Sequence, residues 1–157
     1  FGRASQTAYS EIDFDQLVDD THRLLRLKLE QARIDWTYEP VQSGQKFHAH
    51  RGQIQQVLLN LSLNAIEAMP YGGRILLQAK QVDDSTGKVL QVTFTDSGKG
   101  VPEDVQSQIF DSFLSRGIKG TGLGLSIIKR ILREHYGDIE LVSSKSGETI
   151  FRFWLPL

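Results

Sequence analysis

The sequence contains no cysteine, which excludes both a disulfide-stabilised scaffold and a zinc site built on thiolates. This absence is compatible with a reducing compartment and does not establish one. No apolar run reaches the roughly 18–20 residues of a membrane-spanning helix, so we expect no direct membrane contact. The first ten residues lack an initiator methionine and the apolar segment of a signal peptide. We therefore expect the chain to be a cytoplasmic piece of a longer parent protein. The sequence does not decide whether that parent carries a membrane anchor.

An excess of charge of one sign is also missing. The chain has 18 Lys and Arg against 19 Asp and Glu, and its formal net charge is −1. A general nucleic-acid-binding domain is expected to be basic, so we predict no nucleic-acid partner, while a local phosphate site stays possible. Hydrophobic residues at 39% and charged residues at 24% exclude disordered and collagen-like chains. The length of 157 residues fits one domain that can bury a core.

The pattern of apolar residues predicts three amphipathic helices, over residues 13–33, 52–69 and 122–136. Strands are predicted at 34–38, 46–50, 74–82, 90–95, 138–144 and 149–155, with a short helical piece at 104–113. Helices and mostly antiparallel strands in separate runs favour an α+β fold, a two-layer sandwich of one mixed sheet and about three helices. We assign residues 1–12 to a linker and residues 13–157 to the folded domain.

Two amides lie on one stripe of the second predicted helix. Asn60 and Asn64 are four residues apart, so their side chains project together. Asparagine is a poor residue for a helix interior because its amide competes with the backbone for hydrogen bonds. Taken alone, the stripe is equally consistent with a solvated face and with amide oxygens offered to a hard cation or a polar ligand.

A predicted strand ends at Asp96, and Gly98 and Gly100 follow it. Glycine admits positive φ and lets a ligand approach the backbone, while a carboxylate at a pocket can accept hydrogen bonds from an amino group. Alone, this pattern favours a plain Asp-Gly turn over a binding site. The whole connection over residues 96–121 is rich in glycine, and a connection of that length inside a compact domain is more often functional than idle.

A third segment, Gly-Thr-Gly-Leu-Gly-Leu-Ser at residues 120–126, leads into the last predicted helix. Glycines at a helix N-terminus leave N–H groups free beside the positive end of the helix dipole, which favours a phosphate. No Lys-Ser/Thr pair follows, so the segment is not a P-loop, and its G-x-G-x-G spacing is not a Rossmann fingerprint.

Together these segments resemble the ATP-binding domain of sensor histidine kinases, within the gyrase/Hsp90/MutL-like ATPase superfamily. In chain order, QQVLLNLSLNAIEAMP is similar to the N box, DSGKG to the first glycine box, IFDSF to the F box and GTGLGLSI to the second glycine box. The resemblance runs from about Asp13 to Leu157, and NAIEAMP is most similar to the Ntr/Fix-type branch. It implies a Bergerat-type fold and a protein-histidine kinase of a two-component phosphorelay.

The resemblance also implies a nucleotide-binding role for the matching residues. Asp96 would accept a hydrogen bond from the adenine amino group, Thr149 would support the base, and Gly98 and Gly100 would make room for base and sugar. Asn64 would give an oxygen to Mg²⁺, and Asn60 would face the phosphates of ATP. The second glycine box would complete the ATP site with Gly120, Thr121, Gly122, Leu123, Gly124 and Leu125.

Residues 111–120 would act as a mobile lid with hinges at Gly117 and Gly120. Either Arg116 or Lys119 would reach the γ-phosphate, and the sequence does not decide between them. Hydrolysing members of the superfamily carry a glutamate where this chain has Asn60. An amide cannot act as a general base, so we expect little ATP hydrolysis.

The phosphoacceptor histidine of this family lies at the start of a dimerising helix and is followed by Glu or Asp. His22, His48, His50 and His135 lack that context, so the acceptor is expected on a separate dimerising domain of the same parent. For His48 and His50 we favour exposed strand positions over a metal pair, and we expect His22 and His135 on helix surfaces. The isolated chain is expected to be a monomer, its parent a homodimer, and a response regulator the next partner. A serine kinase of the anti-sigma-factor type and a non-enzymatic nucleotide-sensing module remain as alternatives.

Overall fold

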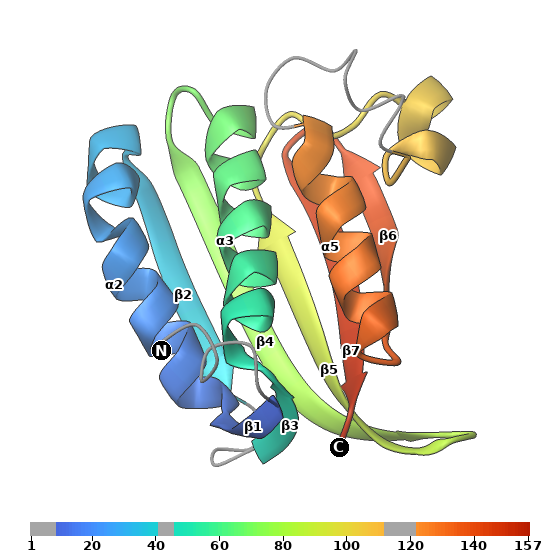
Figure 1. Cartoon of the computed structure of the whole chain (residues 1–157). Coiled ribbons are helices and arrows are strands. Elements are labelled where there is room, and N and C mark those ends of the chain that lie inside the picture. Colours follow the sequence, from blue (N-terminus) through green and yellow to red (C-terminus); the bar gives the residue numbers. More distant parts are fainter. Residues whose placement is uncertain (1–8, 41–45, 112–121) are drawn as a thin grey trace.

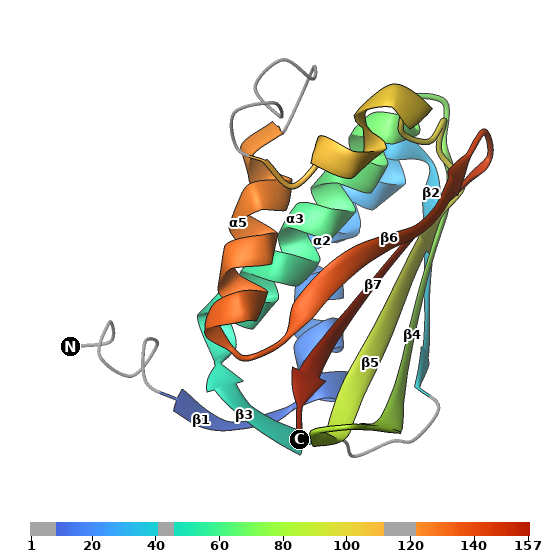
Figure 2. The same ribbon diagram turned by 90° about the vertical axis from the view of Figure 1, so that its right-hand side faces the viewer.

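The computed structural model of the chain describes residues 9–40, 46–111 and 122–157. In chain order the elements are β1 (Tyr9–Asp13), α2 (Phe14–Ala32), β2 (Ile34–Pro40), β3 (Lys46–His50), α3 (Arg51–Ala68), β4 (Gly73–Asp84), β5 (Gly87–Asp96), η1 (Glu103–Gln108), α5 (Gly122–Glu134), β6 (Asp138–Lys145) and β7 (Glu148–Pro156). Helices α2, α3 and α5 lie side by side over one face of the large sheet (Figure 1). The view turned by 90° shows the helices and the sheet as two layers (Figure 2). The α+β two-layer prediction is therefore confirmed.

The large sheet has the strand order β2-β4-β5-β7-β6. Strand β2 pairs with β4 in parallel, whereas the pairs β4–β5, β5–β7 and β6–β7 are antiparallel. Strands β1 and β3 form a separate antiparallel pair. The predicted mixed, mostly antiparallel sheet is thus present. Among the described residues, none of the helices has the length and apolar character needed to cross a membrane.

The core lies between the helical layer and the sheet. Ile54, Val57, Leu58 and Leu61 recur at helical spacing on α3 and are buried. Alternate residues of β7 are buried as well, because successive side chains of a strand point to opposite faces. The helical piece expected at 104–113 is instead a 3₁₀ segment that ends at Gln108. These layers hold the end of β5 and the C-terminal half of α3 next to each other.

The folded domain begins earlier than the sequence predicted. Residues 9–12, assigned to the linker, belong to β1, which pairs with β3 and buries the side chain of Ile12. Asp13 then caps α2 by accepting a hydrogen bond from the backbone N–H of Gln16 at 3.3 Å. The Gln16 side chain does not complete a capping box, because it donates to Asp20 at 2.9 Å.

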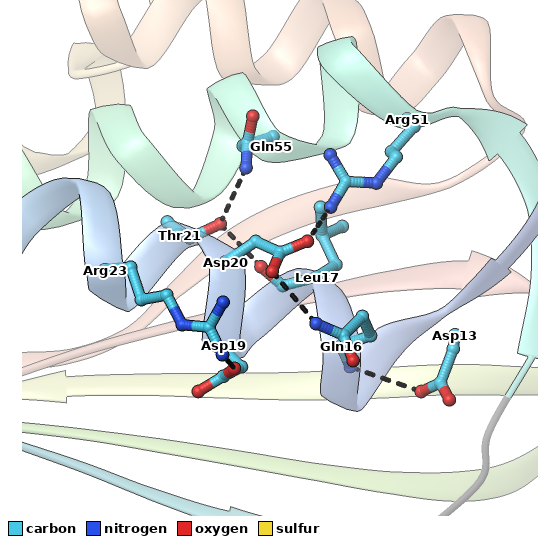
Figure 3. Close-up of polar contacts among 9 residues, drawn as sticks. All are labelled: Asp13, Gln16, Leu17, Asp19, Asp20, Thr21, Arg23, Arg51 and Gln55. Carbon is cyan, nitrogen blue, oxygen red and sulfur yellow. Dashed lines mark hydrogen bonds and ion pairs between the residues drawn. The ribbon is translucent and has the colours of Figure 1, made fainter.

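Polar contacts fasten α2 to the start of α3 (Figure 3). The guanidinium of Arg51 forms an ion pair with Asp20. One turn further along α3, Gln55 Nε2 donates to Thr21 Oγ1 at 3.5 Å. Thr21 in turn donates to the carbonyl of Leu17 at 2.7 Å, which satisfies its buried hydroxyl. The two helices are therefore joined near the end of α3 that is remote from Asn64.

His135 was predicted on a helix surface, and this prediction is wrong. It lies just after the end of α5 at Glu134 and is only 4% exposed, because residues of β1 and β3 pack against it. His135 Nε2 accepts a hydrogen bond from the backbone N–H of His50 at 3.1 Å. The ring of Tyr9 stacks on it with a centroid distance of 5.3 Å. The end of α5 is thereby connected to both β1 and β3.

Candidate functional site

A cavity of about 720 Å³ opens between α3, the loop after β5 and the β6–β7 hairpin. This volume lies within the range of roughly 300–1,000 Å³ that is usual for small-molecule sites. Of the predicted site residues, the cavity wall includes Asn64, Asp96, Gly100, Leu125 and Thr149. The structure thus brings together side chains from four elements that are far apart in the sequence.

Asp96 lies at the end of β5 with its side chain only 5% exposed. Its Oδ1 accepts a hydrogen bond from the backbone N–H of Gly98 at 2.8 Å, and no other group of the described chain bonds to its side chain. Burial raises the pKa of Asp96 to about 6, and the Gly98 hydrogen bond opposes this shift. Thr149 lies directly opposite on β7 and is also buried. Together they offer a carboxylate oxygen and a hydroxyl to a polar group in the cavity.

The two glycines after Asp96 fit closely against other parts of the chain. A Cβ on Gly98 would lie 2.8 Å from Asp96 Oδ1 and 2.9 Å from Ala68 Cβ. Gly100 has a φ of +83°, and a Cβ there would lie 2.9 Å from the carbonyl oxygen of Lys145. Sequence reasoning attributed these glycines to space for a ligand. In the structure a side chain at either position would meet protein atoms, and Gly100 also lines the cavity, so the role of these glycines toward a ligand stays a prediction.

The N-terminus of α5 lies against the amide stripe of α3. A Cβ on Gly124 would be 3.7 Å from both Asn60 Cβ and Asn64 Oδ1. The Nδ2 of Asn64 is buried and has no hydrogen-bond partner in the described chain. A buried polar group left without a partner costs about 1–3 kcal/mol and calls for an explanation, such as a ligand that completes its bonding. The arrangement suits an anion at the helix N-terminus, with the amides beside it.

The remaining predicted site residues lie partly or wholly outside the described chain. Arg116, Gly117, Lys119, Gly120 and Thr121 all fall in the gap between residues 111 and 122. Gly122 and Leu123 are described only as the first backbone residues of α5.

Sequence reasoning missed the apolar walls of the cavity. Val101, Ile109 and Phe151 line it, and Phe110 packs edge-on against Phe151 with a centroid distance of 6.2 Å. Apolar residues within the otherwise polar, glycine-rich connection were the available signal at Val101 and Ile109. The position of Phe151 depends on strand pairing, which the sequence alone does not give.

The histidines lie in different surroundings. His48 is exposed on β3, as favoured, whereas His50, which was also expected to be exposed, is partly buried beside Tyr9. In residues 9–40, 46–111 and 122–157, no three His, Cys, Asp or Glu side chains are grouped so that they could hold a metal ion. His22 stacks on Trp36 with a centroid distance of 5.4 Å.

Comparisons with known proteins agree with this geometry. Residues 49–157 match the family described as histidine kinase-, DNA gyrase B- and HSP90-like ATPase. The whole chain is 32% identical to the signal transduction histidine-protein kinase AtoS of Escherichia coli K12, over 25% of that protein. It is 31% identical over 93% of its length to the sensor histidine kinase ZraS of Salmonella typhi, over 31% of that protein. The chain therefore spans about a quarter to a third of these relatives.

Solved structures show the same relationship. The catalytic domain of histidine kinase ThkA, in a nucleotide-free form, superposes with a TM-score of 0.81 at 31% identity, covering 95% of each chain. ThkA in complex with the response regulator protein TrrA matches 94% of this chain and 41% of its own, with a TM-score of 0.78 at 30% identity. The chain therefore belongs to the histidine kinase-, DNA gyrase B- and HSP90-like ATPase family, as an ATP-binding catalytic domain of the histidine kinase type.

Proposed function

We propose that the chain binds ATP in the described cavity and transfers the γ-phosphoryl group to a histidine on a separate dimerising domain of its parent. The observation that supports this most strongly is the buried Asp96 carboxylate, with one oxygen left free at the cavity, in the same site as Asn64 Nδ2, which has no partner in the described chain. The first group suits an amino-bearing base, and the second suits the polar end of a nucleotide.

The adenine base is placed at Asp96. The free carboxylate oxygen accepts a hydrogen bond from the 6-amino group, whereas the 6-oxo group of guanine would face a carboxylate without a proton between them. Thr149, directly opposite Asp96, supports the same edge of the base. Val101 and Ile109 supply apolar contacts to the ring. Selectivity for ATP over GTP therefore rests on one buried carboxylate.

The phosphates are placed at the N-terminus of α5. The backbone N–H groups of Gly122 and Gly124 face them, with Asn60 on the neighbouring helix. The rest of the second glycine box, Gly120, Thr121, Leu123 and Leu125, completes this part of the site. Arg116 and Lys119, outside the described residues, are the cations proposed for the γ-phosphate.

Asn64 fits the role of a magnesium ligand. Its Oδ1 would be the ligand, and a single protein oxygen is enough because Mg²⁺ takes most of its other ligands from phosphates and water. The unpartnered atom, Nδ2, is a donor and suits a phosphate oxygen beside the ion. When bound, the ion neutralises charge on the triphosphate. Asn64 and Asn60 hold the phosphate chain in place beside it.

Transfer needs a nucleophile that this chain does not provide. An imidazole nitrogen of the acceptor attacks the γ-phosphorus, the bond to the bridging oxygen breaks, ADP leaves, and the imidazole proton passes to solvent. Asn60 cannot accept a proton from water, so hydrolysis in place of transfer is slow. The protein contributes positioning and charge stabilisation. We further propose a homodimeric parent and a monomeric isolated chain. A response regulator is proposed as the next acceptor, by analogy with ThkA, which is solved in complex with the response regulator TrrA.

The test is phosphotransfer from ATP with a radioactive γ-phosphate to the purified dimerising domain of the parent. We expect label on that domain that is lost in acid and stable in base, as phosphohistidine is. The Asp96→Asn variant should transfer poorly at limiting ATP. Label on a serine would favour the anti-sigma-factor type of kinase. ATP binding without any transfer would favour the nucleotide-sensing module.

A further inference from the structure

The loop that follows Asp96 is held from outside the cavity. We call residues 97–101 the glycine loop. The backbone N–H of Val101 donates to Ser144 Oγ at 2.7 Å, so a side chain of β6 satisfies the end of the loop. The N–H of Gly147, in the β6–β7 turn, donates to the carbonyl of Gly98 at 2.9 Å. Two hydrogen bonds therefore clamp the glycine loop to the β6–β7 hairpin.

The loop also packs tightly on this hairpin. A Cβ added to Gly100 would lie 3.0 Å from Ser144 Oγ and 2.9 Å from the carbonyl oxygen of Lys145. On the opposite side, Gln106 Nε2 donates to the carbonyl of Val101 at 3.0 Å. Both backbone groups of Val101 are thus satisfied by side chains rather than by a strand ladder, which makes its position dependent on those side chains.

The clamp acts on the residues that align the Asp96 carboxylate. Gly98 donates its N–H to Asp96 Oδ1 and accepts at its carbonyl from the hairpin, so one residue links the hairpin to the carboxylate. The strand register gives a second connection between Ser144 and Asp96. Ser144 lies opposite Thr149 on β7, and Thr149 lies opposite Asp96 on β5. Ser144 itself is not part of the cavity wall, whereas Val101 and Gly100 are.

We propose that Ser144 is a positioning residue for nucleotide binding. By accepting the Val101 N–H, its hydroxyl fixes the glycine loop, and the loop in turn holds Asp96 in line with the base and keeps Val101 against it. The proposal rests on the proposed function, because it takes the ligand to be an adenine nucleotide. Ser144 is a small, half-buried residue, so its hydroxyl can be removed without opening a large core cavity.

The test compares three variants of the chain. Ser144→Ala removes the hydroxyl that accepts from the Val101 N–H, and Ser144→Thr keeps a hydroxyl on Cβ. Ser143→Ala is the matched control, since the neighbouring hydroxyl has no hydrogen bond in the described chain. For each variant, calorimetric titration measures ATP and GTP affinity, thermal unfolding measures stability, and hydrogen exchange follows the amide of Val101.

We expect Ser144→Ala to weaken ATP binding about 2- to 10-fold, the equivalent of one neutral hydrogen bond. The ratio of ATP to GTP affinity should fall as well, and exchange at the Val101 amide should accelerate. Ser144→Thr should restore all three properties, and Ser143→Ala should leave them unchanged. A purely structural role would lower the unfolding temperature while the ATP to GTP ratio stays constant.

Two failures can be told apart. If the wild type binds ATP and Ser144→Ala binds it equally well with the same selectivity, the positioning role is refuted and the proposed function stands. If the wild type does not bind ATP, the proposed function is refuted and the positioning role falls with it. Equal weakening by Ser143→Ala and Ser144→Ala would also refute the role, because the loss would then not depend on the bond to Val101.

Discussion

Replacing Asp96 with asparagine should have opposite effects on binding and on stability. The variant keeps an oxygen that can accept from Gly98 and loses the negative charge. Losing a hydrogen bond to a charged acceptor should weaken ATP binding by about 1.5–3 kcal/mol. The affinity for ADP should fall by the same amount, because ADP carries the same adenine base. For the nucleotide-free domain, the substitution removes a buried carboxylate that is expensive to ionise.

The size of the stability effect follows from the pKa. Burial raises the pKa of Asp96 from 3.8 to about 6. Between these two pH values Asp96 is mostly protonated in the folded chain and mostly ionised in the unfolded chain. That contribution to stability is present at low pH and is lost as the pH rises through about 6. At about 1.36 kcal/mol per pKa unit, the wild type should lose up to about 3 kcal/mol relative to Asp96→Asn.

Urea unfolding without nucleotide at pH values from 4 to 8 measures this difference. The free energy of unfolding of Asp96→Asn minus that of the wild type should rise between pH 4 and 6 and then level off. Asp104→Asn, at an exposed carboxylate of the same cavity, controls for the change in net charge. A difference that stays flat across this pH range would refute the assignment of Asp96 as a buried carboxylate with a raised pKa.

Three further predictions concern other parts of the molecule. Asn64→Ala should abolish the Mg²⁺-dependent enhancement of ATP binding in titrations and leave the circular dichroism spectrum unchanged, whereas an unfolded variant would make Asn64 a structural amide. Burial lowers the pKa of His135 from its ordinary 6.5, and protonated His135 cannot accept the His50 N–H, so the free energy of unfolding should fall as the pH drops below about 6.5. His135→Gln, which retains an acceptor, should flatten this dependence in urea titrations. Neutralising both Arg116 and Lys119 should weaken ATP binding more than ADP binding by calorimetry, and equal losses would argue against a γ-phosphate contact.

The parts of the site that local patterns encode could be predicted from the sequence. The helical spacing of Asn60 and Asn64 places both amides on one face, and the structure sets that face against Gly124. The end of the strand and the two glycines place Asp96 at a turn, whereas its role in binding came from the resemblance to the histidine kinase domain. The local signals lie within a few residues along the chain, where spacing and backbone geometry decide the outcome.

Other parts depend on contacts between distant segments and gave no local signal. The sequence pattern places His135 at the end of a helix and predicts an exposed side chain. It is buried because β1 and β3 pack over it. Residues 9–12 form a short stretch with Ser10 and Glu11 between Tyr9 and Ile12, and only the pairing with β3 makes them a strand. The sequence also did not show that a Cβ at position 98 would lie 2.9 Å from Ala68 Cβ and 2.8 Å from Asp96 Oδ1. Tertiary packing, which periodicity does not report, decides all three.

The strand register of the cavity has a consequence for folding. Asp96 and Thr149 face each other across β5 and β7, which belong to two different hairpins, β4–β5 and β6–β7. Each hairpin closes a short loop and can form locally, but pairing β5 with β7 joins distant parts of the chain and is therefore entropically slower. The pair that we propose for base binding does not exist until the two hairpins have docked. Recovery of ATP binding during refolding should thus lag behind the recovery of strand signal, and it reports the docking of the two halves of the sheet.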